Sequence, residues 1–280
     1  MIVSDEIHIK LDALIRAFMP VLEDEGSAAC PGKAPGDLYR YWEWPQGIGL
    51  FGLWKLYEKT HDDNILDTLV KYYDARLAEG LPDKDVNTMA PILALSLLAE
   101  NTGRDDYMNV CKEWAEWLMN GGLPRTPERG FQHKTRNDLN DGEVWDDTLM
   151  MAVMPLAVMG RILGRRDYQE EALYQILLHI EYLADPVNGL WYHGYSFNER
   201  NHFSGAFWGR GNSWITMAIP LFLEIIPMSN ANKEYLNTVL ERQVKARLFR
   251  FRMKMAFGIQ FLMMFPHIQN RAVRQGSDTE

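Results

Sequence analysis

One short turn recurs four times along the chain and restricts the folds that the chain can adopt. Its versions are Thr60–Asp63, Gly103–Tyr107, Gly164–Tyr168 and the looser Ser229–Asn232. A nearly all-apolar segment precedes each turn and an amphipathic segment follows it, for example Asp167–Ala184. Helices that are apolar all round are buried, whereas helices with a single apolar stripe lie at a surface. The sequence therefore predicts inner helices that alternate with outer helices.

Repeated helix pairs of this kind close most simply into a double ring. Strand signals are scarce, so we predict an all-α protein with an α/α toroid over residues 1–248. An ordinary helical bundle is the alternative. Asp and Asn in the turns are expected to cap the helices that follow. Pro155 and Pro220 should kink inner helices or mark irregular turns.

The composition excludes several classes of protein. A formal net charge of -9 argues against nucleic acid as a partner, although a local basic pocket for an anionic ligand stays compatible with it. The two cysteines, Cys30 and Cys111, form no disulfide framework or zinc signature. The first residues do not resemble a signal peptide, and no apolar run is long enough to span a bilayer. We expect a soluble cytoplasmic protein without a membrane partner, and the sequence leaves its oligomeric state open.

Polar and aromatic residues stand at equivalent places before the four turns. These residues are Trp44, Asp85, Asp147 and Asn212. In a toroid the starts of the inner helices converge at one mouth of the ring, so we expect the four side chains to face one another. The long loops 121–143 and 185–211 end at the same mouth. They bring His133, His193, Trp208 and Arg210 to it.

Asp147 is the most informative of these residues, because it lies near the start of Val144–Leu163, a segment that is apolar on every face. A carboxylate at the head of a buried helix is unfavourable unless it is paired, caps the helix or is used in chemistry. Glycosidic chemistry needs two carboxylates across a sugar-sized cleft, and Asp85 and Asp147 are the natural pair. A like charge would raise the pKa of one of them, whereas its own helix N-terminus would lower it. The alternative for Asp147, and still more for Asp146, is a helix-terminal acid without a catalytic role.

Aromatic rings gather before the first and the last inner helices. Among them are Trp42, Trp44, Trp208 and Trp214. Flat rings stack on sugar faces, although core packing is their commoner role. Arg210 lies between two glycines, and its guanidinium can bind a carboxylate with two hydrogen bonds, so an acidic sugar is a suitable ligand. Alternatively, Arg210 is salt-bridged to an Asp, and His133 and His193 are structural hydrogen-bonding residues.

Three ordered motifs resemble those of the unsaturated rhamnogalacturonyl hydrolases, glycoside hydrolase family 105. They are Trp145–Met151, Asp185–His193 and Phe207–Trp214, within a resemblance that covers roughly residues 39–248. The unsaturated glucuronyl hydrolases of family 88 look more distant. The resemblance implies an (α/α)6 barrel, complete or incomplete. It also implies hydration of the C4=C5 double bond in the unsaturated uronic acid that polysaccharide lyases leave at a non-reducing end, without a metal or organic cofactor.

The resemblance also implies roles for single residues. Asp147 is similar to the family's general acid/base and Asp85 to a second aspartate of its pattern. Protonation of the vinyl ether would give an oxocarbenium-like centre that a nearby carboxylate stabilises, and the hydrated product, a hemiketal, opens by itself. With the mouth positions included, the expected substrate-binding residues are Trp42, Trp44, His133, His193, Trp208, Arg210, Asn212 and Trp214.

Two other functions stay open. A sugar epimerase on a similar toroid fits less well, because the inner-helix positions carry Asp in place of paired His. A degenerate sugar-binding remnant is favoured by residues 249–280, which are basic, rich in Met and Phe, and show neither helix pattern. The codons of this tail, read in a shifted frame, permit a copy of Asn188–Trp191. We therefore expect a frameshifted tail, a ring without its last helices and impaired activity, or alternatively an ordinary divergent tail.

Overall fold

The computed structural model describes most of the chain. The described residues are 2–23, 37–136, 138–203 and 205–250. The last of them complete a helix that ends at Arg250. Nearly all of the predicted tail, and with it the frameshift interpretation and the predicted boundary at residue 248, therefore falls outside the described residues or stays a prediction.

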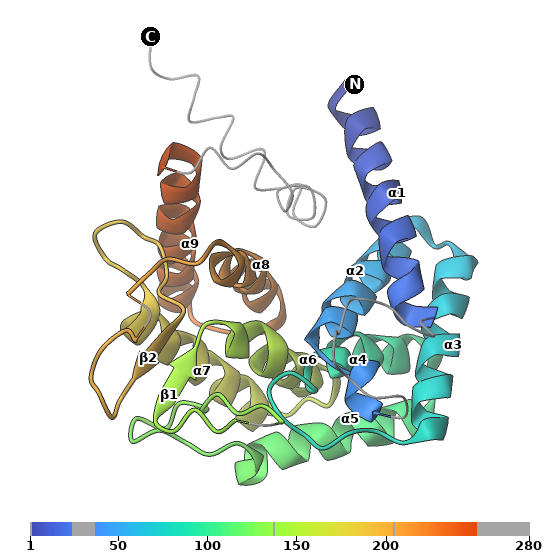
Figure 1. Cartoon of the computed structure of the whole chain (residues 1–280), viewed down its shortest axis with the longest axis horizontal. Coiled ribbons are helices and arrows are strands. Elements are labelled where there is room, and N and C mark those ends of the chain that lie inside the picture. The colour runs from blue at the N-terminus through green and yellow to red at the C-terminus, as the bar shows by residue number, and fades with distance from the viewer. Residues whose placement is uncertain (1, 24–36, 137, 204, 251–280) are drawn as a thin grey trace.

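Helices alternate between an inner and an outer layer, as the repeat predicts. The inner helices are α2 (Trp44–Thr60), α4 (Ala90–Thr102), α6 (Met154–Ile162) and α8 (Gly209–Ile225). The outer helices are α3 (Asp63–Glu79), α5 (Asp105–Trp117), α7 (Arg166–Leu183) and α9 (Asn230–Arg250). Figure 1 shows the pairs following one another along an arc, each inner helix packed on the next inner helix and on its own outer partner. The predicted α/α toroid is confirmed.

Burial separates the two layers. Most side chains of α4, α6 and α8 are buried, whereas α3 and α5 bury one stripe each. A further helix, α1 (Ile2–Glu23), packs on α2, where the ring of Phe18 lies over Gly49. A Cβ added to Gly49 would lie 1.9 Å from Phe18 Cζ, so this crossing depends on the glycine. None of the helices in the described ranges combines the length and the apolar character that crossing a bilayer requires.

The turns between inner and outer helices are held by arginine more than by caps. Asp62 caps α3 as expected, since its side chain accepts from Asn64 N. At α5 and α7, however, the N-cap residues are Arg104 and Arg165, so the capping role predicted for Asp106 is wrong. The same correction applies to Asp167, which lies in the first turn of α7.

These arginine turns also tie the outer helices together. Nε of Arg104 donates to Asp106, 3.0 Å away, and Nη1 lies 2.7 Å from Asp74 of α3. In the next repeat, Nε of Arg165 donates to Asp167 at 2.8 Å and Nη1 lies 3.0 Å from Glu116 of α5. The same arrangement therefore occurs twice. In each turn an arginine pairs with the Asp two residues later and with an acid of the preceding outer helix.

The segment Val144–Leu163 is not one continuous helix. Glu143–Trp145 forms strand β1, which pairs antiparallel with β2 (Gly194–Ser196) beside α7 (Figure 1). The helix begins at Asp147 and passes through a π-helical turn, Leu149–Val153, before α6 starts. Pro155 lies in the first turn of α6, so its prediction as a mark of an irregular turn is confirmed. The helix thus begins at Asp147, as expected, but the strand before it was not predicted, because a short apolar run does not distinguish a buried strand from a buried helix.

Candidate active site

Asp147 lies in the first helical turn after β1. Its Oδ1 is 3.3 Å from Nδ1 of His133. His133 is 3% exposed, and its ring stacks flat on the indole of Trp145 with the centroids 4.1 Å apart. The side chain of Asp147 keeps 17% of its surface exposed. A ligand can therefore reach this carboxylate while its imidazole partner is held behind it.

Two opposing effects act on the carboxyl group of Asp147. Burial raises its pKa, because the charged form loses water. The charge and hydrogen bond of His133, with smaller contributions from His193 and His179, outweigh burial and lower the pKa of Asp147 below its ordinary value. Asp147 is therefore ionised at neutral pH in the unliganded protein.

Asp85, the other predicted catalytic acid, lies on the loop that leads into α4. Its Oδ1 accepts hydrogen bonds from the backbone N and the hydroxyl of Thr88, at 2.8 and 3.1 Å. Asp85 is 3% exposed, and burial raises its pKa despite these hydrogen bonds and the nearby charge of His133. His133 thus acts on Asp85 and on Asp147 alike. The structure brings the two predicted carboxylates to the same histidine.

Asp146 is completely buried and contacts a different histidine from the one that Asp147 contacts. Its Oδ1 is 2.9 Å from Nδ1 of His193, and its backbone N donates to His193 O, also at 2.9 Å. Burial raises the pKa of Asp146 to about 7, with a contribution from the neighbouring charge of Asp147, while His193 opposes the rise. For His193, burial alone would lower the pKa, but the hydrogen bond and charge of Asp146 raise it. The two groups together hold a proton to higher pH than either would in water.

Two carboxylates at this end of the inner helices each keep one buried oxygen without a hydrogen-bond partner, namely Asp85 Oδ2 and Asp146 Oδ2. Asp147 Oδ1 is buried against Nδ1 of His133, 3.3 Å away. A buried polar atom left unpaired destabilises a fold by about 1–3 kcal/mol, and more if it is charged. Clusters of such groups with shifted pKa values are typical of catalytic sites. The observation marks this end of the ring as the candidate active site.

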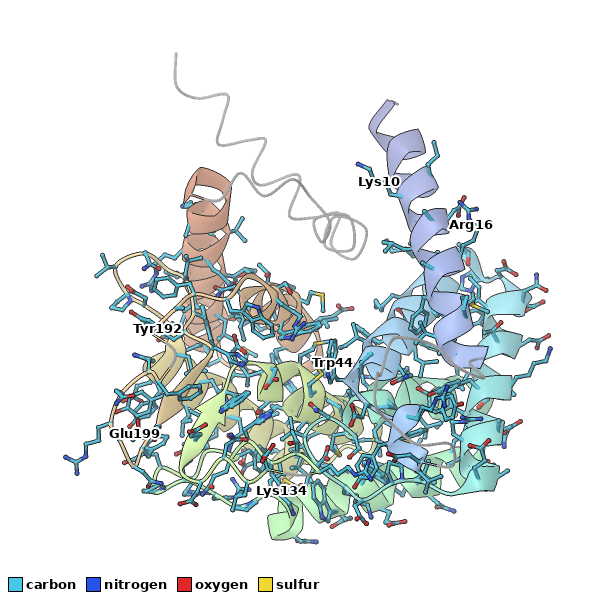
Figure 2. All side chains as sticks on the ribbon, in the orientation of Figure 1. Lys10, Arg16, Trp44, Lys134, Tyr192 and Glu199 are labelled. Atoms are coloured by element: carbon cyan, nitrogen blue, oxygen red, sulfur yellow. The ribbon has the colours of Figure 1, made fainter. Side chains whose placement is uncertain are left out.

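Aromatic rings and one arginine lie beside the carboxylates. The ring of Trp208, which is 36% exposed, lies 4.7 Å from that of His193. The guanidinium of Arg210 lies 4.0 Å above Trp208 and 5.2 Å from Trp44. Trp44 in turn meets Trp214 edge to face, and Figure 2 shows it on the α2 side of the arc, toward α8. Residues from the first and the last described inner helices therefore meet at one place.

The guanidinium of Arg210 stacks on two indole rings. Across the described part of the chain, no carboxylate lies within ion-pair distance of it. Stacking on two aromatic faces is favourable for a guanidinium and leaves its N–H groups available for a carboxylate. The sequence-based alternative, a salt bridge between Arg210 and an Asp, is wrong for this part of the chain.

Besides His133, three of the predicted substrate-binding residues are buried. Trp42 is 1% exposed, and its indole N–H donates to Thr88 O at 2.9 Å within the core. Asn212 is 3% exposed, and its amide pairs with the backbone N and O of Trp191, both at 2.8 Å. Trp214 is 5% exposed behind Trp44. We therefore correct the expectation for Trp42 and Asn212, which support the site from below and offer no free polar group or ring face.

Three other residues near the site were not expected from sequence patterns. Trp145 contacts the rings of both His133 and His193. It is the first residue of the motif Trp145–Met151, which could have indicated it. His179 is fully buried on α7, where burial lowers its pKa to about 4. Its position among the apolar residues of an amphipathic helix resembles that of a core residue. Gly211 lies against Asp146, which no local pattern indicates.

The comparisons with known proteins identify the family of this chain. Residues 31–251 match the family model described as Glycosyl Hydrolase Family 88. This match covers most of the chain, and the chain therefore belongs to that family of glycoside hydrolases.

Its relatives define the relationship further. The chain is 32% identical, over 207 residues, to the unsaturated rhamnogalacturonyl hydrolase YesR of Bacillus subtilis (strain 168), which covers 73% of this chain and 60% of that protein. A crystal structure from Klebsiella pneumoniae, described as a possible member of the GH105 family, is 42% identical with a TM-score of 0.77 over 85% of this chain and 65% of that chain. A similarly described structure from Salmonella enterica serovar Paratyphi A is 40% identical with a TM-score of 0.77, over 84% and 65% of the two chains.

These relatives confirm the predicted family relationship, and they do not favour an epimerase or a non-catalytic remnant. The chain spans less than two thirds of the length of each of the three relatives. What the complete relatives do is accordingly carried to this chain only as a proposal.

Proposed function

We propose that the chain hydrolyses oligosaccharides that end in a 4,5-unsaturated uronic acid, by hydration of the C4=C5 double bond. One observation carries the proposal: the reachable carboxylate of Asp147 contacts a buried histidine, and His193, whose charge also acts on it, adjoins the indole on which the Arg210 guanidinium stacks. The 32% identity to a hydrolase of unsaturated rhamnogalacturonyl substrates supports the same substrate class. Unsaturated galacturonyl-rhamnose is the substrate that we expect.

The proposed reaction consumes one water. The guanidinium of Arg210 binds the carboxylate of the uronic acid. Asp147 delivers a proton to C4, which leaves an oxocarbenium centre at C5 that the buried negative charge around it stabilises. Water adds to C5 and returns a proton to Asp147, giving a hemiketal. The hemiketal opens and releases the neighbouring sugar, so no bond to that sugar needs a separate catalytic step.

The pKa of Asp147 has to rise before it can donate a proton, because the group is ionised in the unliganded protein. An anionic substrate supplies the change, since a like charge a few ångströms away disfavours the carboxylate form. The buried carboxyl of Asp85, whose pKa is already raised, is the second acid of the site. We propose that it polarises His133, whose charge interacts with both aspartates.

A single assay tests the proposal. The protein is incubated with an unsaturated galacturonyl-rhamnose disaccharide, and loss of the double-bond absorbance is followed with time. We expect decay with the parent protein and none with Asp147→Asn, while Asp138→Asn, an exposed acid of the neighbouring loop, behaves as the parent. Binding of the disaccharide without decay in the parent would instead support a sugar-binding remnant.

The fold does not test the predicted location, the predicted lack of a nucleic-acid partner or the predicted lack of a cofactor. A cytoplasmic location and the lack of a nucleic-acid partner stay predictions from the sequence. Within the described ranges, no group of three or more His, Cys, Asp or Glu side chains is arranged to hold a metal ion. The proposed chemistry asks for none, and treatment of the active protein with a chelator should leave the rate unchanged.

A further inference from the structure

Asp146 is the most deeply buried acid of the site, and it has the closest histidine contact. Its side chain has no exposed surface, whereas adjacent Asp147 keeps 17%. The turn between β1 and the helix therefore sends two neighbouring carboxylates in different directions, each to a different imidazole. A buried carboxylate is unfavourable, so we expect Asp146 to have a function at this position.

We propose that Asp146 is a positioning residue that fixes the tautomer and orientation of His193, so that Nε2 is the ring nitrogen presented to the substrate. The proposal rests on the proposed function for its catalytic meaning. The contact carrying it is the 2.9 Å distance between Oδ1 of Asp146 and Nδ1 of His193. A carboxylate that accepts from one ring nitrogen holds the proton on that nitrogen and leaves the other to a ligand.

The surroundings of His193 leave its ring little freedom. The backbones of the two residues are joined by Asp146 N donating to His193 O, next to the paired strands β1 and β2. The ring contacts two indoles edge to face, with centroids 4.6 Å from Trp145 and 4.7 Å from Trp208. Because Nδ1 is also bound to Asp146, the ring would have to break these contacts before it could offer the other nitrogen.

The second oxygen of Asp146 meets the start of α8. A Cβ built on Gly211 would lie 2.1 Å from Asp146 Oδ2, so this helix turn packs directly on the carboxylate. Arg210 precedes Gly211, and its guanidinium stacks on Trp208, which in turn contacts His193. The Asp146 carboxylate thus sets two parts of the site at once, the imidazole through Oδ1 and the first turn of α8 through Oδ2.

Charges around the pair act in known directions. Asp147, in the same turn, raises the pKa of both members, and Arg210 of α8 lowers that of His193. His179 of α7 faces Asp147 and is kept uncharged by burial. The hydrogen bond within the pair is the largest influence that raises the pKa of His193. Removing the negative charge of Asp146 should therefore move His193 toward deprotonation.

Nuclear magnetic resonance of the full chain with 15N-labelled histidine tests this without any substrate. Signals of His193 are assigned by their loss in His193→Gln. In the parent protein we expect the neutral ring to carry its proton on Nδ1, and in Asp146→Asn we expect the pKa of His193 to fall by about one unit or more. Asp138→Asn serves as the matched exposed control and should leave both properties unchanged.

Two results would overturn the proposal. One is a neutral His193 that carries its proton on Nε2 in the parent protein, which needs no variant to be seen. The other is an unchanged His193 titration in Asp146→Asn. If Asp146→Asn does not fold, Gly211→Ala replaces it. This variant keeps the carboxylate but forces Oδ2 to move, so the preference of the His193 proton for Nδ1 should weaken. An unaltered preference would contradict the proposal.

The activity assay separates this proposal from the one on which it rests. If the disaccharide is hydrolysed, Asp146→Asn should lower kcat/KM by about tenfold to a hundredfold and move the alkaline limb of the pH profile to lower pH. A purely structural role would lower the amount of folded protein without moving that limb. If no hydrolysis occurs in the parent, the proposed function fails, while the resonance result still decides the role of Asp146.

Discussion

Charged side chains are exposed and paired at one end of the inner helices, and buried at the other end. At the end that carries the turns, Arg104 and Arg165 are partly exposed and each meets two acids. At the other end, Asp85 and Asp146 are buried, and each keeps an oxygen without a hydrogen bond. The same repeat produces both ends, so the contrast does not come from the fold.

The contrast shows which charges serve structure and which serve chemistry. Exposed ion pairs at the turns each stabilise a protein by only about 0–1 kcal/mol, but they leave no polar atom unpaired. Unpaired buried carboxylates at the mouth oppose folding and are retained where a ligand can use them. The end of the ring that is worse for stability is the end that holds the candidate active site.

The largest expected effect is that of Gly211→Ala. The new Cβ would overlap Asp146 Oδ2, and overpacking of a buried position costs about 1–3 kcal/mol. We expect this loss in the free energy of unfolding, measured by urea denaturation, together with a large loss of activity. In the double variant with Asp146→Ala the clash is absent, so the two changes should be strongly non-additive. Simple additivity would show that Gly211 does not pack on the carboxylate.

The effect of pH is smaller per pH unit, and its sign differs between the two ends. At the mouth, the folded pKa values of Asp146 and His193 are raised, so the stability that they contribute is present at low pH and lost as pH rises through about 7. Between the ordinary pKa of 3.8 and about 7, the free energy of unfolding should fall by roughly 1.4 kcal/mol per pH unit. Asp146→Asn should flatten the fall, and an equally steep fall in that variant would contradict the account.

The smallest effect belongs to the turns. The hydrogen bond from Arg104 lowers the pKa of Asp106, so the stability that Asp106 contributes is present above its unfolded pKa and lost as pH falls through its folded pKa. Because the pair is exposed and screened by solvent, Asp106→Asn should destabilise the protein by less than about 1 kcal/mol at neutral pH. The difference from the parent should vanish in acid, where urea denaturation of both proteins checks it.

Local sequence patterns predicted most of the fold. Helix periodicity and the recurring turn depend on nearby residues, and they located the inner helices and the outer helices. Pro155 was expected to mark an irregular turn and does so. The same patterns placed the starts of the inner helices within a few residues of their observed positions.

Features that depend on distant parts of the chain were missed. The strand at Val144 pairs with residue 195, about fifty positions away, and an apolar run alone does not reveal such a partner. Burial of Trp42 and the use of the Asn212 amide by Trp191 depend on packing between repeats. The prediction that Asp caps these helices was wrong for a similar reason. The observed N-cap residue, Arg104, pairs with an acid of another helix.

The most direct test of the central claim compares two aspartates in two measurements. Asp147→Asn and Asp106→Asn each remove one carboxylate charge, one from the mouth and one from a turn. We predict that Asp147→Asn lowers kcat/KM for unsaturated galacturonyl-rhamnose by at least about 100-fold without loss of stability, and that Asp106→Asn leaves kcat/KM unchanged. Activity of Asp147→Asn within tenfold of the parent would contradict the account.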